Sequence, residues 1–142
     1  MRLDGTIALV TGASRGIGRG IAEAFAAEGA KVAVNYFGSA AAAAEVVDSI
    51  VARGGEAFAV QADVSEEQDV TRMVNQVLDR WGRIDVLVSN AGILTQSHLA
   101  TMPTTMWDEM IRTNLRSAFL VSRAVLPGML ERKQGRIIYV AS

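Results

Sequence analysis

The sequence predicts an α/β protein with a doubly wound parallel sheet, and three features of its 142 residues support this expectation. Apolar runs of strand length alternate with segments whose apolar residues recur at helical spacing. The runs are continuously apolar, which is typical of strands covered by helices on both faces. A glycine-rich turn follows the first run, where such sheets bind ligands. Because alternating strands and helices imply right-handed parallel crossovers, we expect the strand order 3-2-1-4-5.

Five runs have the length and composition of strands. They span residues 6–11, 31–35, 56–60, 84–88 and 135–141. The last run ends directly before Ser142. Because open α/β sheets bind ligands beyond the carboxyl ends of their strands, the Ser142 hydroxyl is a candidate site group.

The segments between the first three runs have helical periodicity. In the first segment, Ile17, Ile21 and Phe25 recur at four-residue spacing, and Gly29 is expected to follow the last turn as the C-cap. The second segment is rich in alanine and can begin at Ser39, whose hydroxyl is a common N-cap. Both helices therefore connect neighbouring strands of the expected sheet.

The third helix has the clearest apolar stripe of the chain. Ser65 and Gln68 have the spacing of a capping box, so we expect the helix to begin there. The stripe recurs at three- and four-residue spacing and consists of Val70, Met73, Val74, Val77, Leu78 and Trp81. This face is expected to pack on the sheet.

Residues 104–131 are expected to be helical, with a break near Asn114. The part after the break is apolar on two faces. One face carries Leu115, Phe119, Ser122 and Leu126, and the other carries Ala118, Val121, Val125 and Met129. Such a helix must pack against the sheet and against a second surface. A partner subunit is the natural candidate for that surface, and a further part of the same chain would also serve.

The composition indicates a single domain over residues 1–142. Half of the residues are apolar and a fifth are charged, which argues against a disordered chain. The net charge of −1 provides no basic surface for nucleic acid, and no run reaches the about 18 apolar residues of a membrane span. Without cysteine, and with His98 as the only histidine, no metal site is expected. No secretion signal is recognisable, so we expect a cytoplasmic location.

The turn after the first strand, TGASRGIG at residues 11–18, has glycine at positions Gly12, Gly16 and Gly18. Glycine allows a tight turn and a close approach of the backbone to a ligand. The turn leads into a helix, whose first N–H groups can bind the negative charge of a pyrophosphate. This arrangement predicts a dinucleotide site, and a glycine-rich turn without a ligand is the simpler alternative.

The charges around this turn indicate which dinucleotide is bound. Arg15 lies beside the helix N-terminus, where a cation is unfavourable unless an anion is bound. The second strand ends at Asn35 and Tyr36, and none of residues 35–39 is acidic. An NAD site would use an acidic residue here to bind the ribose hydroxyls. We therefore predict NADP(H), with NAD as the less favoured cofactor, and expect Asn35 and Tyr36 to contact it.

Five motifs, taken in order, resemble the short-chain dehydrogenase/reductase family, and in particular its 3-oxoacyl-(acyl-carrier-protein) reductase-like members. They are TGASRGIG at 11–18, DV at 63–64, NAG at 90–92, Asn114 and GRIIYVAS at 135–142. The resemblance covers the whole chain and implies a Rossmann-like fold and hydride transfer between a carbonyl and a secondary alcohol. It also implies a small-molecule substrate and a homodimer or homotetramer formed through the long helix that ends near Glu131.

The resemblance implies a role for each matching residue. The turn would bind the cofactor phosphates through Gly12, Ser14, Arg15, Gly16, Ile17 and Gly18. Asp63 would bind the adenine amino group, with Val64 beside it, and its alternative role is to cap the loop after the third strand. Asn90, Ala91 and Gly92 would support the sheet and border the nicotinamide ribose.

The resemblance also implies the catalytic residues. Asn114 would help to hold a water molecule of a proton relay, and Ser142 would bind the substrate oxygen. The family's reaction further needs a tyrosine and, four residues later, a lysine. Tyr36 is followed at that spacing by Ala40, and Tyr139 is followed by no lysine within these residues.

We therefore expect residues 1–142 to be the cofactor-binding N-terminal part of a longer enzyme, without the family's C-terminal strands and lid. These residues alone are expected to be inactive. The alternative is a complete chain that serves as a non-catalytic dinucleotide-binding or interaction module.

Overall fold

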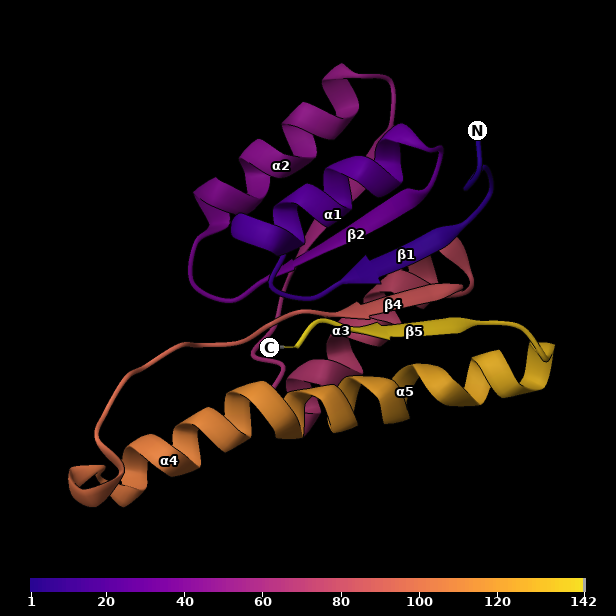
Figure 1. Cartoon of the computed structure of the whole chain (residues 1–142). Helices are drawn as coiled ribbons and strands as arrows, with labels where there is room; N and C mark the ends of the chain where they lie inside the picture. Colours follow the sequence, from indigo (N-terminus) through magenta and orange to yellow (C-terminus); the bar gives the residue numbers. More distant parts are fainter. Residues whose placement is uncertain (142) are drawn as a thin grey trace.

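Five parallel strands cross the centre of the molecule in the order β3-β2-β1-β4-β5, which confirms the predicted topology (Figure 1). The structure is a computed structural model and describes residues 1–141. The strands are β1 (Ile7–Val10), β2 (Lys31–Tyr36), β3 (Glu56–Gln61), β4 (Val86–Ser89) and β5 (Arg136–Tyr139). Since every neighbouring pair is parallel, all carboxyl ends lie at one edge of the sheet.

Helices cover both faces of this sheet, as expected for a doubly wound α/β protein. They are α1 (Gly16–Ala27), α2 (Ala40–Ala52), α3 (Glu67–Trp81), η1 (Leu99–Thr101), α4 (Thr104–Ile111), η2 (Arg112–Arg116) and α5 (Ser117–Arg132). The helices α1 and α2 pack on one face, and α3 and α5 pack on the other (Figure 1). Within residues 1–141, none of these helices is long and apolar enough to cross a bilayer.

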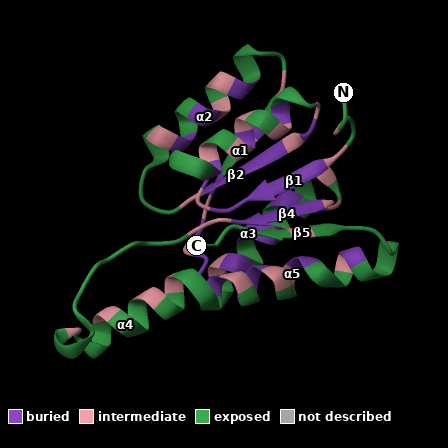
Figure 2. Cartoon of the chain, viewed as in Figure 1, coloured by how far each residue is buried: buried purple, intermediate pink, exposed green. Residues whose placement is uncertain are grey.

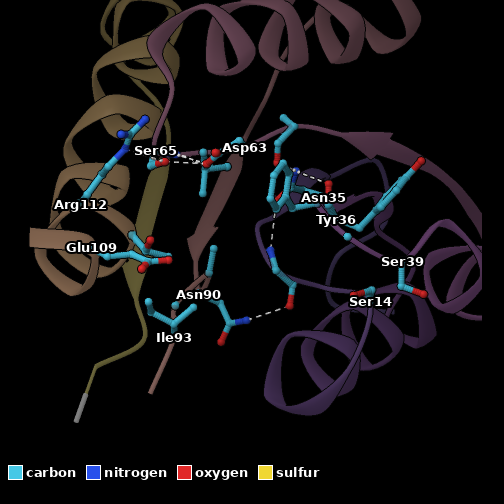
Figure 3. Close-up of a pocket in the computed structure, with 18 of the residues that line it drawn as sticks. Ser14, Asn35, Tyr36, Ser39, Asp63, Ser65, Asn90, Ile93, Glu109 and Arg112 are labelled. Atoms are coloured by element: carbon cyan, nitrogen blue, oxygen red, sulfur yellow. Dashed lines mark hydrogen bonds between the residues drawn. The ribbon is translucent and has the colours of Figure 1, made fainter. Parts of the chain in front are cut away.

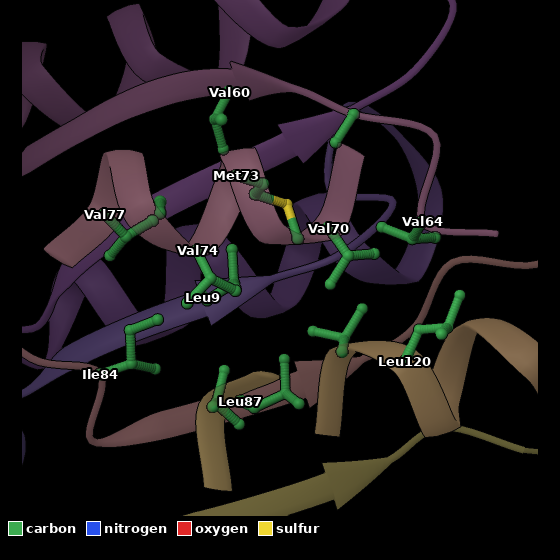
Figure 4. Close-up of a cluster of buried hydrophobic side chains, with 14 of the residues drawn as sticks. Leu9, Val60, Val64, Val70, Met73, Val74, Val77, Ile84, Leu87 and Leu120 are labelled. Carbon is green, nitrogen blue, oxygen red and sulfur yellow. The ribbon is translucent and has the colours of Figure 1, made fainter. Parts of the chain in front are cut away.

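The core forms one layer on each side of the sheet. The strands β1, β2 and β4 between the layers are largely buried, whereas the edge strand β5 is mostly exposed (Figure 2). On the α3 and α5 side, Leu9, Met73 and Leu87 are fully buried among valine and isoleucine side chains (Figure 4). On the α1 and α2 side, the core consists largely of alanine and valine. The small side chains of this second layer allow α1 and α2 to lie close to the sheet.

The ends of α1 and α3 test two expectations from the sequence. Gly29 ends α1 as expected: it follows Glu28 with a left-handed φ of +98°, and the N–H groups of Gly29 and Ala30 donate to the carbonyl oxygens of Ala26 and Phe25. The N-cap of α3 is Glu66, which makes no side-chain capping bond, so the capping box expected from Ser65 and Gln68 is wrong. The physical reason is that the Ser65 hydroxyl is bound outside the helix, where it donates to the carboxylate of the loop after β3 and accepts a hydrogen bond from Arg112 Nε.

The expected break near Asn114 is the π-helical segment η2, which joins α4 to α5. Short π-helical turns within α-helices are frequent at functional sites. The helix α5 is apolar on two sides, as expected. Its buried stripe contains Val121, Val125 and Met129. A second apolar stripe, which we call the exposed stripe, lies along α4, η2 and α5. It consists of Trp107, Ile111, Leu115, Phe119, Leu126 and Leu130.

Candidate functional site

A cavity of about 1000 Å³ opens at the carboxyl ends of the strands (Figure 3). The turn after β1, the end of β2, the loops after β3 and β4, and α4 form its walls. Ten residues predicted to bind a cofactor line it, namely Gly12, Ser14, Arg15, Asn35, Tyr36, Asp63, Val64, Asn90, Ala91 and Gly92. These residues are distant in sequence and meet here because the parallel strands end at one edge of the sheet.

The turn after β1 packs tightly against the loop after β4. Gly12 has a left-handed φ of +60°, and a β-carbon added to it would lie 2.8 Å from the Cα atom of Ala91. A β-carbon added to Gly18 would meet the Gly12 carbonyl oxygen and would lie 2.5 Å from Asn90 Nδ2. Because any larger residue at these two positions would collide with neighbouring atoms, the glycines allow the turn to pack closely on the loop after β4.

Gly16, Ile17 and Gly18, which were predicted to bind the phosphates, form the first turn of α1 and are not among the residues that line the cavity. Gly16 has a φ of +59° and open space around it, while the Ile17 side chain is exposed. Gly18 lies beneath the turn. The first N–H groups of a helix have no partner within it, so these residues can reach an anion only through their backbone.

Arg15 provides the positive charge on this side of the cavity. It is the N-cap residue of α1, has an extended backbone and makes no side-chain capping bond. In the part of the chain that the structure describes, its guanidinium forms no ion pair. A guanidinium beside a helix N-terminus is stabilised when an anion binds between them.

Thr11 holds the two glycine-containing loops together, although it was not singled out from the sequence. Its buried Oγ1 accepts hydrogen bonds from the N–H groups of Asn90 and Ala91 at 2.9 and 3.0 Å. The Nδ2 group of Asn90 donates to the carbonyl oxygens of Thr11 and Gly12, both at 3.1 Å. The side chain of Asn90 therefore supports the turn. A threonine that ends an apolar strand was the only signal in the sequence.

Asn35 lines the cavity, but its side chain is bound within the protein. Its Oδ1 atom accepts the Gly12 N–H at 3.1 Å, and its Nδ2 group donates to carbonyl oxygens at the end of β3. A contact with the cofactor was expected from the sequence, whereas the structure gives this side chain internal partners. Tyr36, the next residue, is half-buried at the cavity wall.

The loop after β3 is closed by Asp63. Its Oδ1 atom accepts hydrogen bonds from the N–H and the hydroxyl of Ser65, at 3.0 and 2.6 Å (Figure 3). Its Oδ2 atom accepts no hydrogen bond from residues 1–141, so it is available to a ligand in the cavity. Arg112 donates from Nε to Ser65 Oγ at 3.2 Å and pairs with Glu66, which attaches η2 to this loop.

Asn114 is exposed and is not one of the lining residues of the cavity. Its Oδ1 atom accepts the Ile93 N–H at 2.7 Å, and its Nδ2 group donates to the Ile93 carbonyl oxygen at 2.9 Å. In this arrangement the carboxamide holds the loop after β4. Ser142, the other predicted catalytic residue, lies outside the described residues.

The face of α4 toward the cavity was missed in the sequence. It carries Thr105, Asp108, Glu109 and, at the start of η2, Arg112. The spacing of three and four residues between these polar side chains is the signal that could have revealed this face. Residues 1–141 contain no cluster of histidine, cysteine and acidic side chains suited to a metal ion.

Comparison with known proteins identifies the family. The family model described as short chain dehydrogenase matches residues 6–142. The chain belongs to the short-chain dehydrogenase family. This finding confirms the resemblance of the sequence, and it assigns the chain to a family of oxidoreductases.

Two curated relatives of this short-chain dehydrogenase chain are 3-oxoacyl-(acyl-carrier-protein) reductases. The protein of Synechocystis sp. is 49% identical over 140 residues, which are 99% of this chain and 57% of that protein. The protein of Staphylococcus epidermidis is 48% identical over 135 residues, which are 95% of this chain and 55% of that protein. The chain thus spans little more than half the length of these relatives.

Solved structures show the same fold. A mutant of a short-chain dehydrogenase/reductase from Serratia marcescens superposes with a TM-score of 0.94 at 36% identity, over 100% of this chain and 57% of that chain. A hydroxysteroid dehydrogenase from Escherichia coli superposes with a TM-score of 0.94 at 38% identity, over 99% of this chain and 59% of that chain. The predicted Rossmann-like architecture is therefore confirmed.

Proposed function

We propose that this chain is the cofactor-binding part of an NADP(H)-dependent oxidoreductase that interconverts a carbonyl and a secondary alcohol. One observation carries the proposal: the cavity joins the glycine-containing turn before α1, the Arg15 guanidinium and a β2 end without a carboxylate. The names of the curated relatives support the reaction, since a 3-oxoacyl group is a carbonyl compound. The substrate is then a small-molecule carbonyl or alcohol compound.

Each part of the cavity offers a group that fits the cofactor. The turn before α1 lines the cavity, and the first N–H groups of α1 can bind the charge of a pyrophosphate. The Oδ2 atom of Asp63 can accept a hydrogen bond from the adenine amino group. Arg15 can pair with a 2′-phosphate. The bound nicotinamide would supply or accept the hydride, and these residues would hold it beside the loop after β4.

The described cavity provides binding groups, but the family's proton-transfer pair is a tyrosine and a lysine four residues apart. Residues 1–142 contain no such pair, since Tyr36 is followed by Ala40 at that spacing and no residue 143 is included. We propose that Asn114 and Ser142 belong to the catalytic group of the whole protein. These 142 residues would then bind cofactor without completing the reaction.

The cofactor proposal predicts that NADPH binds more tightly than NADH and that Arg15→Glu removes this preference. The substitution replaces the charge near the 2′-phosphate with a repelling one, and hydrogen bonds to charged groups contribute about 1.5 to 3 kcal/mol. The dissociation constant of NADPH should therefore rise on the order of 10- to 100-fold, while that of NADH changes less. Titration calorimetry with both cofactors measures the two constants.

Arg53→Glu is the matched control, because it makes the same change of charge on an exposed residue after the far end of α2. It should leave both dissociation constants unchanged. Equal affinities of the unaltered protein for NADPH and NADH would refute the NADP preference. Absence of binding by either cofactor would refute dinucleotide binding itself.

We further propose that the exposed stripe packs against a second copy of the chain. Phe119 is 57% exposed and lies at the middle of this stripe, where Arg123 stacks on its ring. A contiguous exposed apolar surface of this kind marks an interaction site. Phe119→Glu should therefore lower the mass found by sedimentation from that of an oligomer to that of a monomer.

Val51→Glu provides the control for this substitution, since Val51 is similarly exposed on α2, away from the stripe. It should leave the mass unchanged. If Phe119→Glu retains the mass of the unaltered oligomer, the exposed stripe is not the interface. If the unaltered protein is a monomer, self-association itself is excluded.

A further inference from the structure

Asn35 is a buried carboxamide among the strand ends, only 2% exposed. Its Oδ1 atom accepts the Gly12 N–H at 3.1 Å. Its Nδ2 group lies 3.3 Å from the carbonyl oxygens of Val60 and Ala62 and 3.4 Å from that of Tyr36. One side chain thus joins the turn after β1 and the exit of β3, on either side of its own strand β2.

We propose that Asn35 is a positioning residue of the cofactor site, whose amide holds these two walls of the cavity in register without contacting the cofactor itself. This inference rests on the proposed binding of NADP(H). It replaces the expectation from the sequence that Asn35 is a ligand.

The partners of Asn35 require an acceptor and a donor on one planar group. Gly12 offers an N–H, whereas Val60 and Ala62 offer carbonyl oxygens, so the orientation of the amide follows from its neighbours. Aspartate has the same shape but would direct a second, charged oxygen at the two carbonyls. Such a buried and unpaired group is strongly unfavourable.

The hydrogen bonds of Asn35 reach the walls at both ends of the proposed ligand. Gly12 is held at its N–H by Asn35 and at its carbonyl oxygen by Asn90. The Ala13 N–H also donates to the backbone carbonyl of Asn35, at 2.8 Å. At the exit of β3, Ala62, whose carbonyl oxygen accepts from Asn35, directly precedes Asp63. Asn35 therefore couples the pyrophosphate side of the cavity to its adenine side.

This placement predicts an effect that does not depend on the 2′-phosphate. The amide of Asn35 is bound to backbone groups, whereas the proposed 2′-phosphate contact is the side chain of Arg15. Loss of the amide should weaken the binding of NADPH and NADH by the same factor. A residue that selects between the two cofactors would change their ratio.

The test measures NADPH and NADH dissociation constants for Asn35→Ala, which removes the amide without adding a charge, in the purified protein at a temperature where circular dichroism shows it to be folded. We expect both constants to rise on the order of tenfold, with their ratio unchanged. Ile50→Ala is the control for lost stability, since it removes buried methyl groups near the far end of α2. It should lower the melting temperature and change both dissociation constants less than about twofold.

The outcomes separate the possible failures. If the unaltered protein binds neither cofactor, the proposed function fails and this inference fails with it. If it binds and Asn35→Ala binds equally well, only the positioning role is overturned. The role is also overturned if Ile50→Ala loses as much affinity at a similar melting temperature, or if Asn35→Ala changes the ratio of the two dissociation constants. Should Asn35→Ala not fold, Asn35→Ser, whose hydroxyl can keep one hydrogen bond, is judged by the same criteria.

Discussion

Gly12→Ala is expected to destabilise the protein by about 2 to 4 kcal/mol and to abolish nucleotide binding. The new β-carbon would lie 2.8 Å from the Cα atom and 3.2 Å from the N atom of Ala91, and these backbone atoms cannot turn away. The left-handed φ of Gly12 adds about 1 to 2 kcal/mol for any residue with a β-carbon. Urea unfolding followed by circular dichroism measures the loss of stability, and NADPH titration measures binding.

Gly16→Ala is the matched control for this substitution. Gly16 has nearly the same φ, +59°, but a β-carbon on it would meet nothing within 4 Å. It should therefore show only the backbone contribution of about 1 to 2 kcal/mol. Equal losses of stability in the two variants would contradict the close packing of Gly12 against Ala91.

Thr11→Val should destabilise the protein by about 2 to 4 kcal/mol, although the two side chains have nearly the same shape. The hydroxyl is the acceptor for the N–H groups of Asn90 and Ala91, and each buried N–H without a partner costs about 1 to 3 kcal/mol. The loop after β4 should also become mobile at this point. Hydrogen exchange of the two amides, together with urea unfolding, measures both effects.

Thr11→Ser keeps the hydroxyl and removes only a methyl group, which contributes about 1 kcal/mol when buried. The serine variant should therefore be more stable than the valine variant, and its two amides should stay protected. The reverse order of stability would show that the methyl group, and not the hydrogen bonding, makes Thr11 important.

The sheet was predictable because its signals are local. Each strand is a continuous apolar run, and the order 3-2-1-4-5 follows from right-handed crossovers between parallel strands. The start of α3 was not predictable in the same way. The spacing of Ser65 and Gln68 fits a cap, in which the hydroxyl oxygen accepts a backbone N–H of the helix. In the structure this hydroxyl instead donates to Asp63 at 2.6 Å and accepts a hydrogen bond from Arg112, 47 residues away. A pattern of residue types does not rank competing hydrogen-bond partners.

The sequence predicted which residues lie at the site, but not which groups their side chains bind. The motifs placed Gly12, Asn90 and Asp63 at the cavity, and the structure brings them together. Asn35 was expected to face the cofactor, yet its amide binds backbone groups 23 and 27 residues away. Such bonds depend on the distance between strands, which is absent from the local sequence.

The sequence by itself determined the fold class, the family and the location of the glycine-rich turn, because each is encoded in periodicity or in residues that are neighbours in the chain. The tertiary structure alone decided which polar groups remain free at the strand ends. In the folded protein the Thr11 hydroxyl and the Asn35 amide bind internal partners, whereas the Oδ2 atom of Asp63 accepts no hydrogen bond from residues 1–141. The physical reason is that a hydrogen bond needs its donor and acceptor within about 3 Å, and only folding brings residues so distant in sequence that close.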